Sequence, residues 1–372
     1  MKNHELKRAK RRFISILKKQ LANTIKNESG DVDSLTKNKL QVLKKRRFKI
    51  IKDKDHQEKV EKRERISAPV FIDYYNESNL HKTNLFLAKL RKNIIEKRKS
   101  ISINFDQTKQ ITASAMISFL AEVDTLISCS PKGKNAITFT HPKVEKVESV
   151  LKQIGFYNLL KKPVREAKDF EDIAYWNYAS GARSDTQQAS EAMKEIELKI
   201  SQIAQRKLYK GFIEAMANCV EHAYYGQEAD DDTSTKWWAF AGIKESVLVV
   251  VICDKGIGIP KSLPLTRRDE IIESVKNMLQ LKKLNDSAMI KIASQMGRTR
   301  TKQGHRGKGL KDIRAIIDTL NEGNLSIYSN KGYYRYFRNN KELFDNRKEH
   351  KTSVCGTIVE WAIPLTADAR ED

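Results

Sequence analysis

The apolar positions between residues 68 and 165 alternate between short extended runs and longer runs with helical spacing. Extended runs rich in β-branched and aromatic residues predict strands, and apolar residues recurring every three or four positions predict helices. The expected strands are 69–75, 101–105 and 136–140, and the expected helices are 80–98, 113–127 and 144–154. This alternation predicts an α/β domain spanning residues 67–165.

The pattern changes in residues 166–372. A polar stretch leads into a long amphipathic helix between Glu191 and Tyr225, and a second helix ends near Leu320. The apolar runs typical of strands are 236–243, 246–254, 325–329, 333–337 and 357–363. Helices combined with neighbouring antiparallel strands predict an α+β sandwich, a largely antiparallel mixed sheet covered by helices, with a polar lid at about 260–303.

The first 66 residues predict a basic arm that is helical or partly disordered. They hold 22 Lys and Arg against 9 Asp and Glu, a net charge of +13 out of +23 for the whole chain. This excess favours an acidic partner, either nucleic acid or an anionic protein surface. The run KKRRFK at 44–49 could contact phosphates, with Phe48 and Ile50 adding apolar contact, but solvated basic runs look the same.

The remaining bulk features indicate a cytoplasmic protein. No apolar stretch approaches the length of a membrane span, and the charged N-terminus has no signal-peptide core. The cysteines are scattered without a CxxC pair, which argues against a zinc site and a disulfide framework and predicts reduced, mostly buried thiols. They are Cys129, Cys219, Cys253 and Cys355.

A polar column is predicted on the long helix. Glu214, Asn218 and His222 are spaced by four residues and share one helix face, whereas Phe212 and Met216 can face the core. An amide oxygen suits magnesium, and a carboxylate one turn away could orient or deprotonate an attacking water or hydroxyl. The same spacing is typical of an ordinary amphipathic helix with a polar stripe.

A second candidate lies where an apolar strand ends. Asp254 follows the run 249–253 and precedes Gly256, Gly258 and Ile259. An aspartate at a buried strand end can accept a hydrogen bond from an adenine amino group, and the glycines allow the backbone to close over the ring. A strand followed by a tight turn would have the same sequence.

A glycine-rich basic loop precedes the second helix, and its backbone amides together with the helix N-terminus could bind an anion. The loop consists of Gly304, His305, Arg306, Gly307, Lys308, Gly309 and Leu310. A flexible basic loop is the alternative. It is not a Walker A loop, because Lys308 is followed by Gly309, and the turn at 256–261 is not a Rossmann fingerprint, because Lys261 stands where a third glycine belongs.

Thr357 follows Gly356 at the start of the last strand, where its hydroxyl could complete a water network around Asp254. In chain order, these four segments resemble the N, G1, G2 and terminal Gly-Thr boxes of the GHKL superfamily, whose members share the Bergerat ATP-binding fold. The resemblance covers about residues 190–365, and four boxes in the family order are far more specific than any one of them.

The resemblance implies ATP and Mg²⁺ as cofactors and a role for each matched residue. Glu214 corresponds to the general base, Asn218 to the magnesium ligand and Asp254 to the adenine reader. Gly256, Gly258 and Ile259 correspond to the adenine-side turn, the segment 304–310 to the phosphate loop under a mobile lid, and Thr357 to the support of Asp254. His222 corresponds either to a phosphate or lid contact or to a simple helix end.

Residues 68–165 resemble, at the level of pattern, the STAS fold of anti-sigma-factor antagonists. The segments that carry this resemblance are ISINF, the helix through Thr112 and Ser114, and AITFTHPKVEKVESVLKQIGFYNLL. The resemblance implies that Thr112 or Ser114 could accept a phosphoryl group. Helix capping by the hydroxyl is the alternative interpretation for each.

The leading hypothesis is an ATPase-type switch in which ATP orders the lid and changes contacts with the STAS-like domain, a partner protein or nucleic acid. One alternative is an anti-sigma-type protein serine/threonine kinase, which EAMANCVEHAYYG resembles. The other is a nucleic-acid-associated regulatory or phage-defence component that binds ATP with little turnover and uses residues 1–66. Dimerisation through the ATP domain is common in this superfamily, so the resemblance also allows a homodimer. No membrane partner is expected.

Overall fold

The computed structural model describes residues 63–165, 170, 177–181, 200–225, 236–267, 269–296, 309–339 and 342–365, without the side chains of 177–179 and 309. All of these residues fall within one compact unit that begins at Arg63. Most of the predicted basic arm, residues 1–62, lies outside the described residues, and residues 64–66 at its end belong to the first strand. In the part of the chain that is described, no helix is both long enough and apolar enough to cross a membrane.

The N-terminal part, residues 63–165, is built on a parallel sheet with the order β1-β3-β5. Its strands are β1 (Glu64–Ser67), β3 (Ile101–Asn104) and β5 (Ile137–Thr140), and a separate ladder joins β2 (Phe71–Ile72) to β4 (Gln110–Ile111). Its helices are α3 (Glu77–Arg91), which continues as a π-helical turn over Lys92–Glu96, α4 (Ala113–Cys129), α5 (Glu145–Gln153) and α6 (Phe156–Leu160), and a 3₁₀ turn covers Gly133–Ala136. The alternation of strands and helices predicted for this region is therefore confirmed.

The strand expected over 69–75 is shorter than predicted. Only Phe71 and Ile72 are extended in a ladder, because Asp73 turns the chain toward α3. Its carboxylate accepts hydrogen bonds from the backbone N–H groups of Tyr75 and Asn76, at 2.8 and 3.3 Å. Asn76 then caps α3 by accepting from the backbone N–H groups of Ser78 and Asn79.

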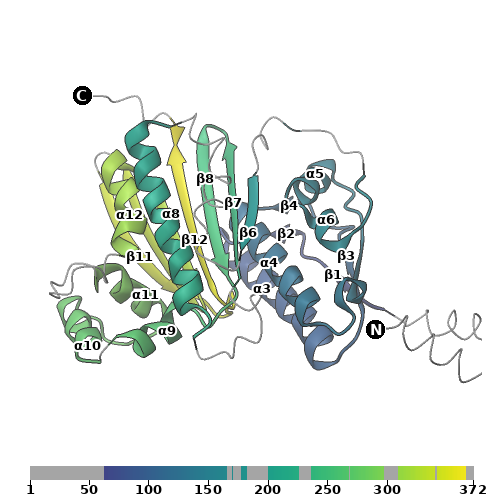
Figure 1. The fold of residues 1–372 in the computed structure, drawn as a ribbon, viewed down its shortest axis with the longest axis horizontal. Coiled ribbons are helices and arrows are strands. Elements are labelled where there is room, and N and C mark those ends of the chain that lie inside the picture. The colour runs from purple at the N-terminus through teal and green to yellow at the C-terminus, as the bar shows by residue number, and fades with distance from the viewer. Residues whose placement is uncertain are drawn as a thin grey trace, which may run out of the picture. The chain divides into compact units, whose positions relative to one another are not determined.

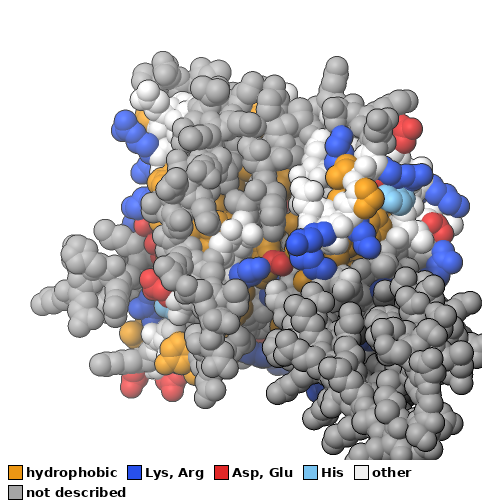
Figure 2. Space-filling view, turned by 45° about the vertical axis from the view of Figure 1, so that its right-hand side comes forward, with side chains coloured by type: hydrophobic (Ala, Val, Ile, Leu, Met, Phe, Trp, Pro, Cys, Tyr) orange, Lys and Arg blue, Asp and Glu red, His pale blue; other side chains and the backbone are white. Residues whose placement is uncertain are grey.

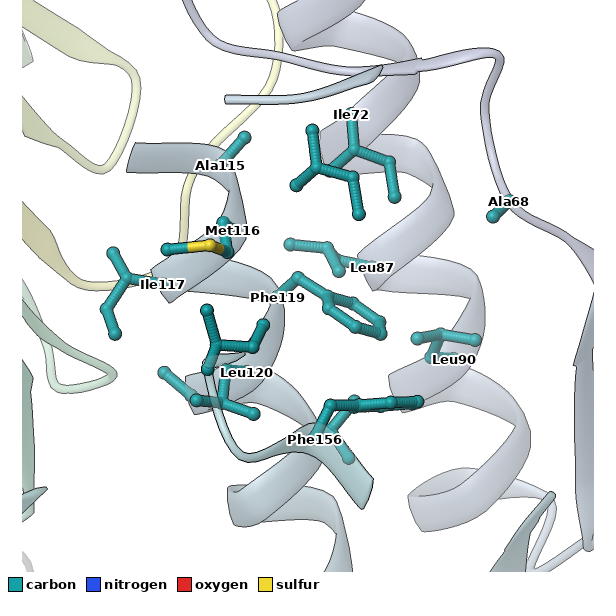
Figure 3. Packing of buried hydrophobic residues seen from close by; sticks show 14 of the residues in the cluster. Ala68, Ile72, Leu87, Leu90, Ala115, Met116, Ile117, Phe119, Leu120 and Phe156 are labelled. Atoms are coloured by element: carbon teal, nitrogen blue, oxygen red, sulfur yellow. The ribbon is translucent and has the colours of Figure 1, made fainter. Parts of the chain in front are cut away.

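Helix α4 is buried along nearly its whole length, because it packs on both sides. One side faces α3, where Phe119 points toward Leu87 and Leu90 (Figure 3). The other side contacts the strands β7, β8 and β12 of a second sheet. A helix that is apolar around most of its circumference must be covered on all sides. The hydrophobic core of the N-terminal part consequently continues into that sheet, through residues such as Trp238 and Ile358.

The second sheet has seven strands in the order β11-β10-β9-β12-β8-β7-β6, and every neighbouring pair is antiparallel. The strands are β6 (Asn177–Gly181), β7 (Trp237–Lys244), β8 (Val247–Asp254), β9 (Glu322–Ser329), β10 (Gly332–Asn339), β11 (Glu342–Glu349) and β12 (Thr357–Pro364). Helices α8 (Gln202–His222) and α12 (Gly309–Leu320) cover one face, and α3 and α4 lie on the other (Figure 1). The described residues thus form a mixed α/β fold, as predicted.

Two elements of this sheet were not predicted. Strand β6 lies in a stretch read as polar linker, and β11 is an edge strand whose residues are nearly all exposed. A strand without a buried face shows no alternation of apolar and polar residues, so periodicity cannot detect it.

In its described residues, 260–267 and 269–296, the region predicted as a polar lid contains three helices. They are α9 (Ile259–Thr266), α10 (Asp269–Met278) and α11 (Asp286–Gln295). These helices share a small hydrophobic core of their own, which includes Leu263, Val275, Ala288 and Ile292. The sequence-based prediction of a polar lid did not resolve these helices, because each short helix buries only a narrow apolar stripe within a segment that is polar on average.

Basic side chains are also found on the surface of the described residues. On the face that Figure 2 turns forward, where the N-terminal part comes toward the viewer, blue Lys and Arg side chains outnumber the red acidic ones. The positive charge of the chain is therefore visible on the described surface as well as in the sequence of the arm.

Candidate functional site

The candidate site is a pocket between α8, the end of β8, α9 and the start of α12. Its space, including the opening to solvent, amounts to about 900 Å³. Six of the residues singled out from the sequence line it: Asn218, His222, Asp254, Gly258, Ile259 and Thr357. Leu310, the second residue of α12, lines it as well. The fold therefore brings together residues that are up to 139 positions apart in sequence, from Asn218 to Thr357.

Helix α8 presents the polar column as predicted. The hydroxyl of Ser201 caps its N-terminus by accepting from the N–H of Ala204. Phe212 and Met216 are buried in the core against the sheet, while Asn218 and His222 are half-buried and line the pocket. Because Asn218 and His222 are spaced by four residues, they lie on the same face of α8 and line the pocket together.

Asp254 is the most constrained polar group of the site. Its Oδ1 accepts the backbone N–H groups of Gly256 and Thr357, at 2.8 and 3.2 Å. Its Oδ2 accepts a weak hydrogen bond from the Cys219 thiol, at 3.8 Å. Burial raises the pKa of this carboxyl to about 6, although the two N–H donors favour the ionised form. One carboxylate oxygen is therefore held by two backbone N–H groups, and the residue as a whole lines the pocket.

Gly256 packs closely against the end of α8. It does not line the pocket among the described residues; instead a Cβ on it would lie 2.0 Å from the carbonyl oxygen of Ala223. The adjacent Ile257 N–H donates to the same carbonyl over 2.7 Å. Glycine is required here because the end of α8 touches the turn after β8.

Glu214 lies one turn before Asn218, outside the pocket lining. Burial raises its pKa, and the negative charge of Asp312 on α12 adds to the effect. A carboxyl with a raised pKa is better suited to take up a proton near neutral pH.

The phosphate loop predicted from the sequence lies mostly outside the described residues. This applies to Gly304, His305, Arg306, Gly307 and Lys308. Gly309 is the first residue of α12, so the loop does precede a helix N-terminus, as expected.

Sequence reasoning missed several residues of the pocket. The apolar wall includes Leu263 and Met296, and the exposed guanidinium of Arg267 adds a positive charge at the rim. These residues belong to α9, α11 and their connections, the region taken for a polar lid, so no motif pointed to them. Cys219 was read only as a core residue, although its thiol contacts Asp254.

Lys255, which directly follows Asp254, points to the opposite face of the sheet. Its side chain is 2% exposed, and its ammonium group donates to Ser118 Oγ at 2.8 Å and to the Val354 carbonyl at 3.3 Å. It also lies 3.8 Å from the buried carboxylate of Glu122, which pairs with Arg91 of α3. The turn that carries Asp254 is therefore anchored to α4 by a buried cation.

The two hydroxyl groups considered as phosphoryl acceptors are buried. Ser114 donates to the carboxylate of Glu360 on β12 and has no exposed surface. Thr112 is at the N-cap position of α4, but its hydroxyl donates to Asp73 instead of capping the helix. The capping interpretation is therefore wrong for both side chains, and neither hydroxyl is open to a kinase in this arrangement.

The cysteines are free thiols, as predicted, but only Cys219 and Cys253 are buried, whereas Cys355 is half-buried and Cys129 is exposed. In the described residues no group of three or more His, Cys, Asp or Glu side chains could hold a metal ion. This is compatible with magnesium bound through a phosphate ligand, since Mg²⁺ keeps several waters and needs only one or two protein oxygens.

Neither the known protein-family models nor the curated proteins give a match to this chain. The inference about its function therefore depends on the geometry of the site.

Proposed function

We propose that residues 200–365 bind ATP in the pocket beside Asp254 and that the protein is a nucleotide-dependent switch. The arrangement around Asp254 carries the proposal. Its Oδ1 is held by two backbone N–H groups, and its Oδ2 remains for a ligand donor such as the exocyclic amino group of adenine. The apolar wall at Ile259, Leu263 and Met296 suits a flat ring.

Magnesium fits the same site in one respect. Asn218 offers an amide oxygen in the pocket next to His222, on the side of α8 that leads toward Glu214. Mg²⁺, when bound, would neutralise phosphate charge there. Asn218 would hold the ion together with the phosphates, and Glu214 would accept a proton from a water or hydroxyl.

The buried contacts of Lys255 support the switch. A ligand bound to Asp254 would contact the turn that also carries Lys255. The ammonium group of Lys255 donates to Ser118 and lies near Glu122, and both of these residues belong to α4. Lys255 and Glu122 are both buried and paired. Displacement of the turn would therefore disturb these contacts with the N-terminal part and would be energetically unfavourable. ATP binding is therefore expected to change the packing of α4 against β8.

The test uses radiolabelled ATP with magnesium, wild-type protein and a Glu214→Gln variant, following free phosphate and protein-bound label separately. Retained ATP binding with product formation lowered about 10²- to 10⁴-fold in the variant would assign Glu214 to proton transfer. Label on protein would select a kinase, and free phosphate an ATPase. Absence of ATP binding by the wild-type protein at any magnesium concentration would refute the proposal.

A further inference from the structure

A second hollow lies on the other face of the seven-stranded sheet, behind the strand that carries Thr357. It measures about 940 Å³ including its opening. Its walls come from β9, β10, β11 and β12 and from the turn before α3, which contributes Tyr74 and Tyr75. None of its residues lines the pocket beside Asp254.

The sheet register builds this hollow from two rows of neighbouring side chains. In one row Glu360 of β12 is opposite Ser326 of β9, and Ser326 is opposite Arg335 of β10. In the other, Tyr328 of β9 is opposite Tyr333 of β10, and Tyr333 is opposite Lys348 of β11. Residues at every second position of a strand point to the same face, so both rows present their side chains to the hollow.

The floor of the hollow is buried and polar. Ser326, Tyr328 and Glu360 are 2–3% exposed, and His350 is 9% exposed. The carboxylate of Glu360 already accepts from Tyr75 and Ser114 through its Oε2 atom. Both ring nitrogens of His350, in contrast, are buried and have no hydrogen-bond partner among the residues that the structure describes.

An unpaired buried imidazole is energetically unfavourable, since each nitrogen has lost water without gaining a partner. Burial lowers the pKa of His350, so near neutral pH the ring has one N–H donor and one acceptor nitrogen. A ligand that offers both an acceptor and a donor would satisfy the two atoms.

The surrounding groups narrow the class of ligand. The rings of Tyr328, Tyr333 and His350 lie with centroids 4.7 to 6.5 Å apart and form an aromatic wall on which a flat heterocycle can stack. Arg335 and Lys348 are exposed at the rim and supply positive charge for a phosphate. Lys348 pairs with Glu77 across the rim, at 2.7 Å, and an incoming phosphate would compete for that contact.

We propose that this hollow is a binding site for a 5′-mononucleotide, with the base stacked beside Tyr333 and hydrogen-bonded to His350, and the phosphate at Lys348 and Arg335. The site is separate from the pocket beside Asp254 and does not depend on it for binding.

The experiment is a calorimetric titration of the full chain with the 5′-monophosphates of adenosine, guanosine, cytidine and uridine, and with ribose 5-phosphate, which has no base. At least one nucleotide should bind, and ribose 5-phosphate should bind at least tenfold more weakly. His350→Phe keeps the ring and removes both nitrogens, and it should weaken binding about tenfold. Lys348→Ala should weaken it several-fold, whereas Lys331→Ala, which removes an exposed lysine outside the hollow, should not change it.

The Asp254→Asn variant separates the two sites, because binding in the hollow should survive it. The proposal is overturned if no monophosphate binds at millimolar concentration, if ribose 5-phosphate binds as tightly as the nucleotides, or if Asp254→Asn abolishes binding while His350→Phe does not. Circular dichroism and thermal melts of each variant show whether the fold is intact, and a resonance shift of the His350 imidazole in wild-type protein gives a readout that needs no variant.

Discussion

Thr357 and Asp254 are opposite each other in the ladder between β12 and β8, and the backbone N–H of Thr357 donates to Asp254 Oδ1 over 3.2 Å. The hydroxyl of Thr357 lies 3.0 Å from Ser329 Oγ, and Ser329 also accepts the N–H of Ile259 at the start of α9. The strand pairing thus orients the carboxylate and the turn beside it together. A single substitution at Asp254 can therefore change which ligand groups the pocket accepts, while the backbone hydrogen bonds that hold this side chain remain.

We expect Asp254→Asn to change base preference. The amide oxygen can still accept from Gly256 and Thr357, while its NH₂ group replaces the oxygen that faces the pocket. A donor there opposes the amino group of adenine and matches the carbonyl of guanine, so affinity for ATP should fall about 10- to 100-fold relative to GTP. Competition binding with both nucleotides measures the ratio, and Asp106→Asn, distant in sequence and outside the pocket lining, is the control. An unchanged ratio would show that Asp254 does not contact the base.

The pKa of Asp254 predicts opposite pH trends for binding and stability. Because burial raises this pKa to about 6, the ionised form that accepts an amino donor is lost below that pH, so ATP affinity should rise with pH through about 6. A carboxyl whose folded-state pKa is raised stabilises the fold below its unfolded pKa, and this contribution is lost as pH rises through about 6. Asp254→Asn should therefore be more stable than wild type at pH 8, by up to about 3 kcal/mol.

Calorimetry and thermal melts between pH 5 and 8 check both trends. Protonation of the triphosphate is common to the two proteins, so the difference between wild type and Asp254→Asn isolates the carboxyl. His222→Gln, which changes another residue of the pocket, should retain the wild-type trend. A difference between wild type and Asp254→Asn that does not vary with pH would place the pKa of Asp254 outside this range.

Removing the charge of Glu122 should lower the free energy of unfolding more than removing the charge of Lys255. Glu122 is 1% exposed and serves both Arg91 and Lys255. Glu122→Gln leaves both cations without a counter-charge and should cost about 3–5 kcal/mol, whereas Lys255→Met leaves Glu122 paired with Arg91 and should cost about 1–2 kcal/mol. Urea unfolding of the two variants gives the comparison. Equal losses would mean that the two cations do not share Glu122.

Gly256→Ala tests a steric requirement without backbone strain. The added Cβ would meet the carbonyl of Ala223 at 2.0 Å, so the end of α8 must move, at a cost of about 3 kcal/mol. Gly133→Ala is the matched comparison, since its φ is +52° but nothing lies within 4 Å of a Cβ; it should cost roughly 1–2 kcal/mol through conformation alone. Both values come from denaturant unfolding, and a Gly256→Ala loss no larger than that of Gly133→Ala would contradict the close approach.

The sequence predicted the elements with a strong period. Helix α4 and strands β8 and β12 agree with expectation to within about two residues, because their burial imposes the pattern. The Asp254 turn and the polar column of α8 were also found, since both depend on local spacing. What could not be read were the edge strand β11, whose side chains are exposed, and the α10 and α11 helices, whose apolar stripes are narrow.

The contacts between the two parts of the fold were beyond sequence reasoning for another reason. Lys255 reads as one more basic residue in a basic chain, and its burial depends on Ser118 and Glu122, which are more than 130 positions away. Likewise Glu360 is an isolated acid within an apolar strand, and only its neighbours Tyr75 and Ser114 explain its place. Pairings across such distances have no local signal, because they are set by which helix covers which face.

Strand β12 has consequences for how the protein can change during evolution. From Thr357 to Trp361 every residue is buried, with Thr357 and Val359 facing one pocket and Glu360 facing the other. No position in this segment is a neutral surface site at which substitutions can accumulate. An insertion of one residue would exchange the two sets of side chains and damage both faces at once. Variation among descendants of this chain should therefore be concentrated on β11 and the outer helices, while this segment stays nearly fixed.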